Sequence, residues 1–158
     1  LGHDAPFAFE QTYRPAPNIE RMRVGTPPVL QLSALDVALD LWIDVDMAEL
    51  RAASIALCEQ FIAEVEAKCP ALTLVSPREA SQRGSQVSFA FEHGYAAMQA
   101  LIARDVIGDF RAPDIMRFGF TPLYIDAGDV TCAVDILKEV LDHRLWDEPR
   151  FKITSRVT

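Results

Sequence analysis

The sequence predicts a small α/β domain in which a short, mixed sheet is covered by helices. Three observations indicate this fold class. Several segments repeat apolar residues at helical spacing, short runs between them have the length or alternation of strands, and half of the residues are hydrophobic. A chain of 158 residues is long enough for one domain with a core of its own.

Residues 1–27 are expected to form an arm. They are rich in proline, arginine and aromatic residues and show neither helical nor strand periodicity. A stretch of this length without elements of its own is not expected to stand as a domain. We interpret it as lying over another part of the protein, and we interpret the start at Leu1 as a fragment boundary.

Residues 28–45 are expected to form a connecting helix. Apolar residues from Val29 to Ile43 point almost all round it, which predicts burial on most faces. Because a small domain offers little surface to bury such a helix, we expect it to pack between this domain and another body of protein. Thr26 is suited to be its N-cap and Pro27 its first residue.

Residues 46–158 are expected to form the α/β domain itself. Asp46 caps an amphipathic helix that ends before Pro70, and Asp129 caps a last helix. Between them we expect a helix over residues 95–104. The predicted strands cover residues 72–75, 87–91, 106–110 and 115–120.

The composition argues against several classes of function. A net charge of −8 with scattered basic residues disfavours nucleic-acid binding. No apolar run approaches a membrane span of roughly 20 residues, and no signal peptide is visible. The cysteines, whose spacing indicates reduced thiols in the cytoplasm, are Cys58, Cys69 and Cys132. The histidines, which match no metal-site spacing, are His3, His93 and His143.

Gly25 and Thr26 form the first candidate site. One interpretation is simply a helix start. The other is a phosphate contact, in which the Thr26 hydroxyl donates to the anion and Gly25 lets a ligand approach the backbone. Pro27 and Pro28 remove two N–H donors, so a phosphate would depend on the threonine and its neighbours.

Arg117 is the second candidate. In a strand, Met116 and Phe118 share one face, and Arg117 lies on the other. A guanidinium among apolar neighbours requires an anion, which it can bind with two parallel hydrogen bonds. Spacing alone leaves two alternatives open, a structural ion pair and a ligand carboxylate or phosphate.

Four stretches together resemble the C-terminal part of the kynureninase family. They occur in the family's order and span most of the chain. They are residues 1–3 (Leu-Gly-His), 23–30 (Arg-Val-Gly-Thr-Pro-Pro-Val-Leu), 83–87 (Arg-Gly-Ser-Gln-Val) and 117–124 (Arg-Phe-Gly-Phe-Thr-Pro-Leu-Tyr).

The resemblance implies the C-terminal small domain of a homodimeric fold-type I enzyme that depends on pyridoxal 5'-phosphate (PLP). Residues 1–27 would then be the edge of a large domain that lies upstream. The family hydrolyses L-kynurenine to anthranilate and L-alanine in tryptophan breakdown, with PLP as electron sink. By the same resemblance, Thr26 contacts the cofactor phosphate, with Gly25 beside it, and Arg117 holds the substrate α-carboxylate.

The chain departs from the family in lacking the Schiff-base lysine, which lies upstream in the family. Its only lysines, Lys68, Lys138 and Lys152, are not in the family's context. We therefore expect the chain alone to be inactive. Two alternatives remain: the small domain of another class V PLP enzyme, an aminotransferase or desulfurase, or a non-enzymatic α/β module that dimerises through the apolar helix.

Overall fold

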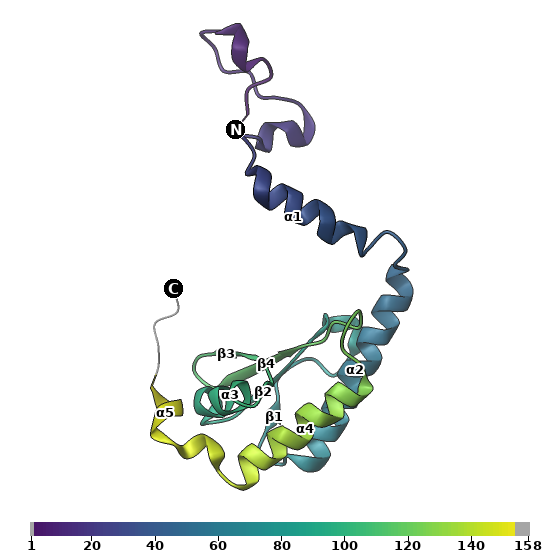
Figure 1. The fold of residues 1–158 in the computed structure, drawn as a ribbon, viewed down its shortest axis with the longest axis vertical. Helices are drawn as coiled ribbons and strands as arrows, with labels where there is room; N and C mark the ends of the chain where they lie inside the picture. Colours follow the sequence, from purple (N-terminus) through teal and green to yellow (C-terminus); the bar gives the residue numbers. More distant parts are fainter. Residues whose placement is uncertain (1, 154–158) are drawn as a thin grey trace. The chain divides into compact units, whose positions relative to one another are not determined.

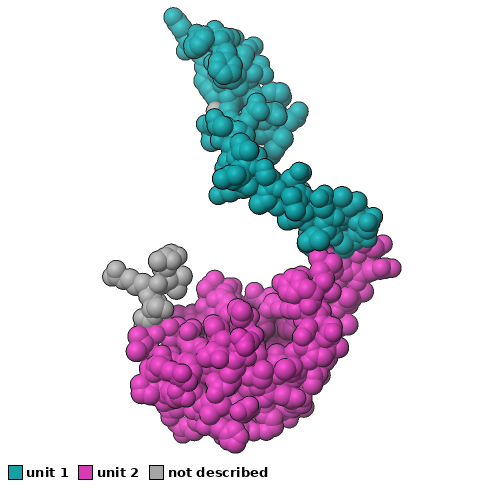
Figure 2. Space-filling model, in the orientation of Figure 1, with its two compact units in different colours: residues 1–45 teal, residues 46–158 magenta. Residues whose placement is uncertain are grey.

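The computed structural model describes residues 2–153. The chain divides into two compact units, residues 1–45 and residues 46–158, which Figure 2 shows in different colours. Each unit is described here by itself. Within the described residues, no helix is long and apolar enough to cross a membrane.

The first unit contains two short 3-10 helices and one α-helix. The 3-10 helices are η1 (Pro6–Ala8) and η2 (Asn18–Met22), and the α-helix is α1 (Val29–Asp40). Among the described residues of this unit, an isolated antiparallel β-bridge joins His3 to Pro15. The prediction that Thr26 caps the apolar helix was wrong, because Pro28 occupies the N-cap position and no side chain caps the helix.

Helix α1 ends earlier than the sequence indicated, at Asp40 instead of near residue 44, and a turn follows it. All of its residues are exposed within this unit. Leu30 is 86% exposed and Val37 69% exposed, so the helix presents apolar side chains on every side. Its expected burial against another body of protein stays a prediction.

The second unit begins with the long helix α2 (Met47–Lys68). The Asp46 carboxylate accepts hydrogen bonds from the backbone N–H groups of Ala48 and Glu49, at 2.7 and 3.1 Å. This confirms the predicted cap, which satisfies two donors that an uncapped helix would leave without partners.

Four antiparallel strands form the sheet, in the order β1-β2-β4-β3. They are β1 (Thr73–Leu74), β2 (Gln86–Ala90), β3 (Asp109–Arg111) and β4 (Ile115–Gly119), which are labelled in Figure 1. The expectation of a mixed sheet was wrong, since every described pairing is antiparallel. The strand predicted at residues 106–110 was also misplaced, because Val106 to Gly108 form a connecting loop.

The second unit contains three further α-helices, one between β2 and β3 and two after β4. They are α3 (Gly94–Ile102), α4 (Ala127–Asp142) and α5 (Pro149–Lys152), with the 3-10 helices η3 (Ala80–Gln82) and η4 (Leu145–Asp147). Asp126, not Asp129, is the N-cap of α4. Asp129 instead stands at the third helical position and completes a capping box with Asp126. Helix α4 is also not the last helix, since α5 follows it.

One face of the sheet packs against the helices and forms the core. Phe61 of α2 lies 4.9 Å from Phe118 and 5.1 Å from Phe120, measured between ring centroids. Val87, Phe89 and Met116 are fully buried. Alternation along β2 and β4 therefore directs Ser88 and Arg117 to the opposite face.

Candidate functional site

Arg117 lies in the middle of β4, and its side chain is 28% exposed. Its two neighbours in β4, Met116 and Phe118, are buried in the core. This confirms the alternation predicted from the sequence. Two apolar neighbours fix the strand in the core, and the guanidinium is thereby held on the other face of the sheet.

An ion pair with Asp109 of β3 satisfies part of the Arg117 side chain. The Arg117 Nη2 atom donates to the Asp109 Oδ2 atom. The Arg117 Nε atom, in contrast, is buried and has no hydrogen-bond partner among the described residues. An unpartnered buried donor is costly, and the terminal Nη1 group of the same guanidinium also has no hydrogen bond to a described residue besides the ion pair at Nη2. The structural ion pair exists, and it leaves capacity for an anion.

Asp109 was not identified from the sequence. It faces Arg117 in the strand register, and its other oxygen accepts from Arg111 Nη1 at 3.1 Å. The hydrogen bond from Arg117 is the main reason that the pKa of the Asp109 carboxyl is lowered. The sequence carries no clear signal for it, because β3 has only three residues, of which the middle one, Phe110, contacts Tyr95 of α3 on the core side.

Gly108 is the residue that lets β3 start so close to β4. A Cβ atom at this position would lie 2.9 Å from the Arg117 carbonyl oxygen and 2.6 Å from the Met98 methyl group. Both distances are shorter than ordinary contacts, so a larger residue would push the loop away from Arg117. The glycine therefore helps to place Asp109 beside the arginine.

Gly25 and Thr26 lie in the first unit, just before α1. A Cβ atom at Gly25 would meet nothing within 4 Å, so the space beside this backbone is open. The Thr26 side chain is exposed. Among the described residues, the Thr26 hydroxyl and the backbone N–H groups of Gly25 and Thr26 have no hydrogen-bond partner. These three donors are suited to a phosphate group.

The lysines lie in ion pairs and not in a site for covalent chemistry. Lys68 is 2.8 Å from both Glu64 and Asp135. Hydrogen bonds that these lysines donate to carboxylates raise the pKa of Lys68 and of Lys138. Lys152 pairs with Asp147. An amine that attacks a carbonyl group must be neutral, and these contacts favour the charged form.

The cysteines give no support to a desulfurase. Burial raises the pKa of the Cys69 thiol to about 11 and raises that of Cys58 as well. A catalytic thiol requires a lowered pKa, because the thiolate is the nucleophile. Cys132 is exposed on α4. Among the described residues, no group of three or more His, Cys, Asp or Glu side chains is placed to hold a metal ion.

Residues 83–87 have a structural role in the second unit. The Arg83 side chain is 3% exposed and pairs with Glu59 of α2. It also donates to the carbonyl oxygens of Pro77 and Arg78, at 2.9 and 2.6 Å. These bonds hold the segment before β2 against α2. The Arg83 charge is balanced by the Glu59 carboxylate.

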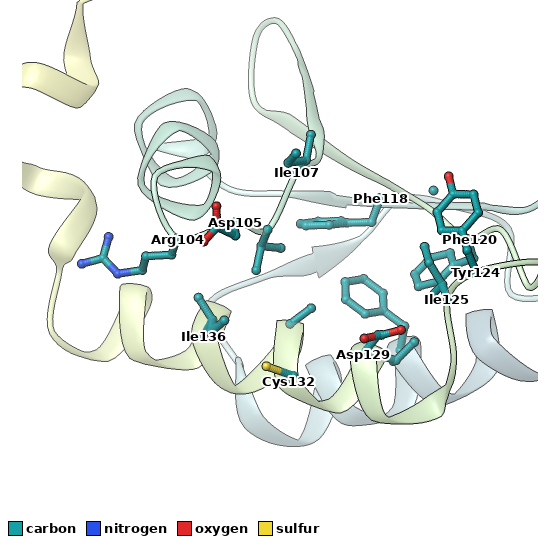
Figure 3. Close-up of a pocket in the computed structure, with 15 residues that line it drawn as sticks. Arg104, Asp105, Ile107, Phe118, Phe120, Tyr124, Ile125, Asp129, Cys132 and Ile136 are labelled. Atoms are coloured by element: carbon teal, nitrogen blue, oxygen red, sulfur yellow. The ribbon is translucent and has the colours of Figure 1, made fainter.

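A hollow of about 550 Å³ opens on the core side of the sheet. Phe118 lies across it, Asp129 and Cys132 extend from α4 on one side, and Ile107 lies opposite (Figure 3). Because Phe118 and Arg117 point to opposite faces of β4, this hollow is separate from the arginine. Its walls are mainly apolar, and we assign it no part in the site.

Comparison with known proteins identifies the family. Residues 50–137 match the family described as the kynureninase C-terminal domain, which is more than half of the chain. The chain belongs to this family.

Full-length relatives carry the same name. A kynureninase of Burkholderia mallei (strain SAVP1) is 48% identical over 159 residues, which cover 99% of this chain and 38% of the relative. A kynureninase of Pseudomonas fluorescens is 49% identical over 160 residues, covering 100% of this chain and 38% of the relative. The chain thus spans about two fifths of the length of these kynureninases and corresponds to a C-terminal fragment.

Proposed function

We propose that this chain works as the C-terminal part of a kynureninase, which hydrolyses the Cβ–Cγ bond of L-kynurenine to give anthranilate and L-alanine. The observation that carries the proposal is that kynureninases match almost the whole chain, and that this chain holds an arginine whose Nε–H group has no partner among the described residues. The proposal extends to a cytoplasmic homodimer that acts in tryptophan breakdown.

In this proposal, Arg117 binds the α-carboxylate of the substrate. Arginine carries five N–H donors in a planar fork, which matches a carboxylate oxygen pair. One donor is used by Asp109, and the Nε–H group is without a partner among the described residues. The carboxylate would accept from the terminal N–H groups that Asp109 leaves unused and fix the orientation of the amino acid relative to the sheet.

The cofactor of the proposal is PLP, which supplies the electron sink for carbon–carbon bond cleavage when it is bound. The residues present fit its phosphate group. Gly25 leaves open space beside the backbone, and Thr26 supplies a hydroxyl and an N–H group without partners in the described part of the chain. The proposed role of these two residues is to hold the phosphate.

The lysine that carries the cofactor would come from the part of a kynureninase that lies outside this chain. In the same proposal, residues 1–27 are the edge of a large cofactor domain, residues 28–45 the connecting helix and residues 46–158 the small domain. The exposed apolar surface of α1 supports this proposal. An apolar helix is shielded from water only when it packs against further protein.

Replacing Arg117 tests the proposal. In the longer enzyme that contains this chain, Arg117→Ala should raise KM for L-kynurenine by about 10- to 100-fold, because a charge-assisted hydrogen bond contributes about 1.5–3 kcal/mol. The measurement is steady-state kinetics with anthranilate fluorescence as the signal. Arg78→Ala is the matched control, since it removes an arginine that pairs with Glu66 on the surface of the same unit.

An unchanged kcat/KM in Arg117→Ala, with Arg78→Ala also unchanged, would contradict the carboxylate role. Kynuramine, which lacks the α-carboxylate, offers a second comparison. Its binding, measured as competition against kynurenine, should be equal in the wild-type enzyme and in Arg117→Ala.

A further inference from the structure

Three polar residues form a row across the face of the sheet that carries the arginine. Arg117 of β4 is in register with Ser88 of β2 on one side and with Asp109 of β3 on the other. The residues that alternate with them, among them Phe89, Phe110 and Met116, lie on the core side. The row therefore places one carboxylate directly beside the guanidinium and an uncharged hydroxyl on its other flank.

Asp109 restricts Arg117 through one end of the guanidinium only. Its carboxylate accepts from the terminal Nη2 atom of Arg117 and from Nη1 of Arg111. The Arg117 Nε atom remains buried and without a partner among the described residues. A long arginine side chain has many rotamers in solution, and an ion pair at its tip reduces that freedom before a ligand arrives.

Gly108 and the strand register indicate that this contact is built into the fold. The Gly108 backbone approaches the Arg117 carbonyl so closely that any larger residue would displace one of them. Asp109 follows directly, as the first residue of β3. Its position beside Arg117 is thus set by backbone geometry, in contrast to the flexible side-chain pairs on the surface.

We propose that Asp109 is a positioning residue for carboxylate binding: it holds the Arg117 guanidinium so that the terminal N–H groups that Asp109 leaves unused are presented to the substrate. This inference rests on the proposed function and extends it to a second residue. The opposite effect would follow if Asp109 competed with the substrate for Arg117, because its removal would then strengthen binding. The two alternatives predict opposite changes in substrate affinity when Asp109 is replaced, so a binding measurement distinguishes them.

The first experiment needs no activity and uses the 158-residue chain. In ¹⁵N–¹H spectra, the Arg117 Nε–H signal, assigned by its loss in Arg117→Lys, should exchange slowly with water. Asp109→Asn keeps the size of the side chain and removes its charge, and it should accelerate this exchange by about tenfold or more. Arg111→Ala removes the exposed partner of the same carboxylate and should leave the exchange rate within about twofold. Unchanged exchange in Asp109→Asn would overturn the inference.

The second experiment uses the longer enzyme. Asp109→Asn should raise KM for L-kynurenine by about tenfold while kcat stays within about twofold. In the Arg117→Ala background, Asp109→Asn should have no additional effect, because the residue acts through the arginine. Asp109→Glu, which restores the charge, should recover part of the affinity.

The outcomes separate this inference from the proposed function. If Arg117→Ala leaves kcat/KM unchanged, the proposed function fails. If Arg117→Ala raises KM but Asp109→Asn leaves it unchanged or lowers it, only the positioning role fails. If Asp109→Asn raises KM equally in the wild-type and Arg117→Ala backgrounds, the positioning role is also overturned. The change in KM would then reflect a general loss of stability.

Discussion

The side chains of the second unit differ sharply in their exposure, and this determines their chemistry. Cys58 and Cys69 are buried in the core between helix and sheet, whereas Cys132 lies on the exposed side of α4. A thiol must ionise and be reached by a reagent before it reacts. Burial works against both requirements for the first two cysteines.

We predict that a disulfide reagent such as Ellman's reagent modifies Cys132 of the native chain rapidly and leaves Cys58 and Cys69 unmodified. Burial raises the pKa of Cys58 and raises that of Cys69 to about 11, so few thiolates are present near neutral pH. The measurement is the number of fast-reacting thiols per chain, compared with the number in denaturant. Cys132→Ser should show none, and a fast reaction in that variant would contradict the packing described.

At the same scale, the sequence predicted the orientation of Arg117 but not its partner. Met116 and Phe118 carry a strong apolar signal at every second position, and this assigns the arginine to the other face. Asp109 lies in a strand of three residues, too short for alternation to stand out. Its pairing with Arg117 is a long-range register, which local pattern does not specify.

Among the elements, α2 and α4 are joined by a polar contact beside the core. The Glu64 carboxylate accepts from Lys68, Gln60 and the Thr131 hydroxyl, at 2.8, 2.9 and 2.8 Å. Gln60 also donates to the Ala127 carbonyl oxygen at 2.9 Å, at the start of α4. The contact thus links the C-terminal half of α2 to the first turns of α4.

We predict that this contact makes stability sensitive to acid. The hydrogen bond from Lys68, followed by those from Gln60 and Thr131, lowers the pKa of Glu64 from 4.5 to about 2. A carboxyl whose pKa is lower in the folded state stabilises the fold above its unfolded pKa, and that stabilisation disappears as the pH falls toward 2. Because water screens the group, Glu64→Gln should cost about 1 kcal/mol at pH 7.

The measurement is the free energy of unfolding from urea titrations between pH 7 and pH 2.5. Glu64→Gln should lose less stability than the wild-type chain over this range. Glu139→Gln, which changes an exposed acid of α4 without an ion pair among the described residues, is the control. Parallel curves for Glu64→Gln and wild type would show that the contact contributes nothing.

Element prediction succeeded where local chemistry decides the outcome. The cap at Asp46 and the strand around Arg117 both follow from short patterns. The direction of the strands does not, and so the sheet proved to be antiparallel instead of mixed. At α4, Asp126 and Asp129 are both good capping residues, and the capping box uses them together with Asp126 first.

For the whole molecule, the important property is the length of the chain compared with its relatives. It covers 38% of the kynureninases that it matches, and their remaining length has no counterpart in it. The sequence indicated the family through four separated stretches. It could not indicate what covers α1, because an apolar surface does not specify its partner.

We predict that the purified 158-residue chain does not convert L-kynurenine to anthranilate, even with added PLP. Its lysines lie in ion pairs with Glu64, Asp135, Asp142 and Asp147. The assay is anthranilate fluorescence over several hours, with the full-length kynureninase of Pseudomonas fluorescens as the positive control. Turnover that is abolished by Arg117→Ala would contradict the prediction and assign complete chemistry to this chain.

The alternation along β4 has a further consequence for how this protein tolerates changes in length. Odd and even positions of the strand have different roles, since Met116 and Phe118 pack in the core and Arg117 faces the other way. Inserting one residue into the strand between Met116 and Arg117 would shift the following residues by one position, turning the Arg117 charge toward the core and Phe118 away from it. Inserting two residues would preserve the parity. Changes of length inside β4 should therefore be tolerated only in steps of two, and a single-residue insertion there should abolish folding and carboxylate binding together, whereas one residue added to the turn at positions 112–114 should be tolerated.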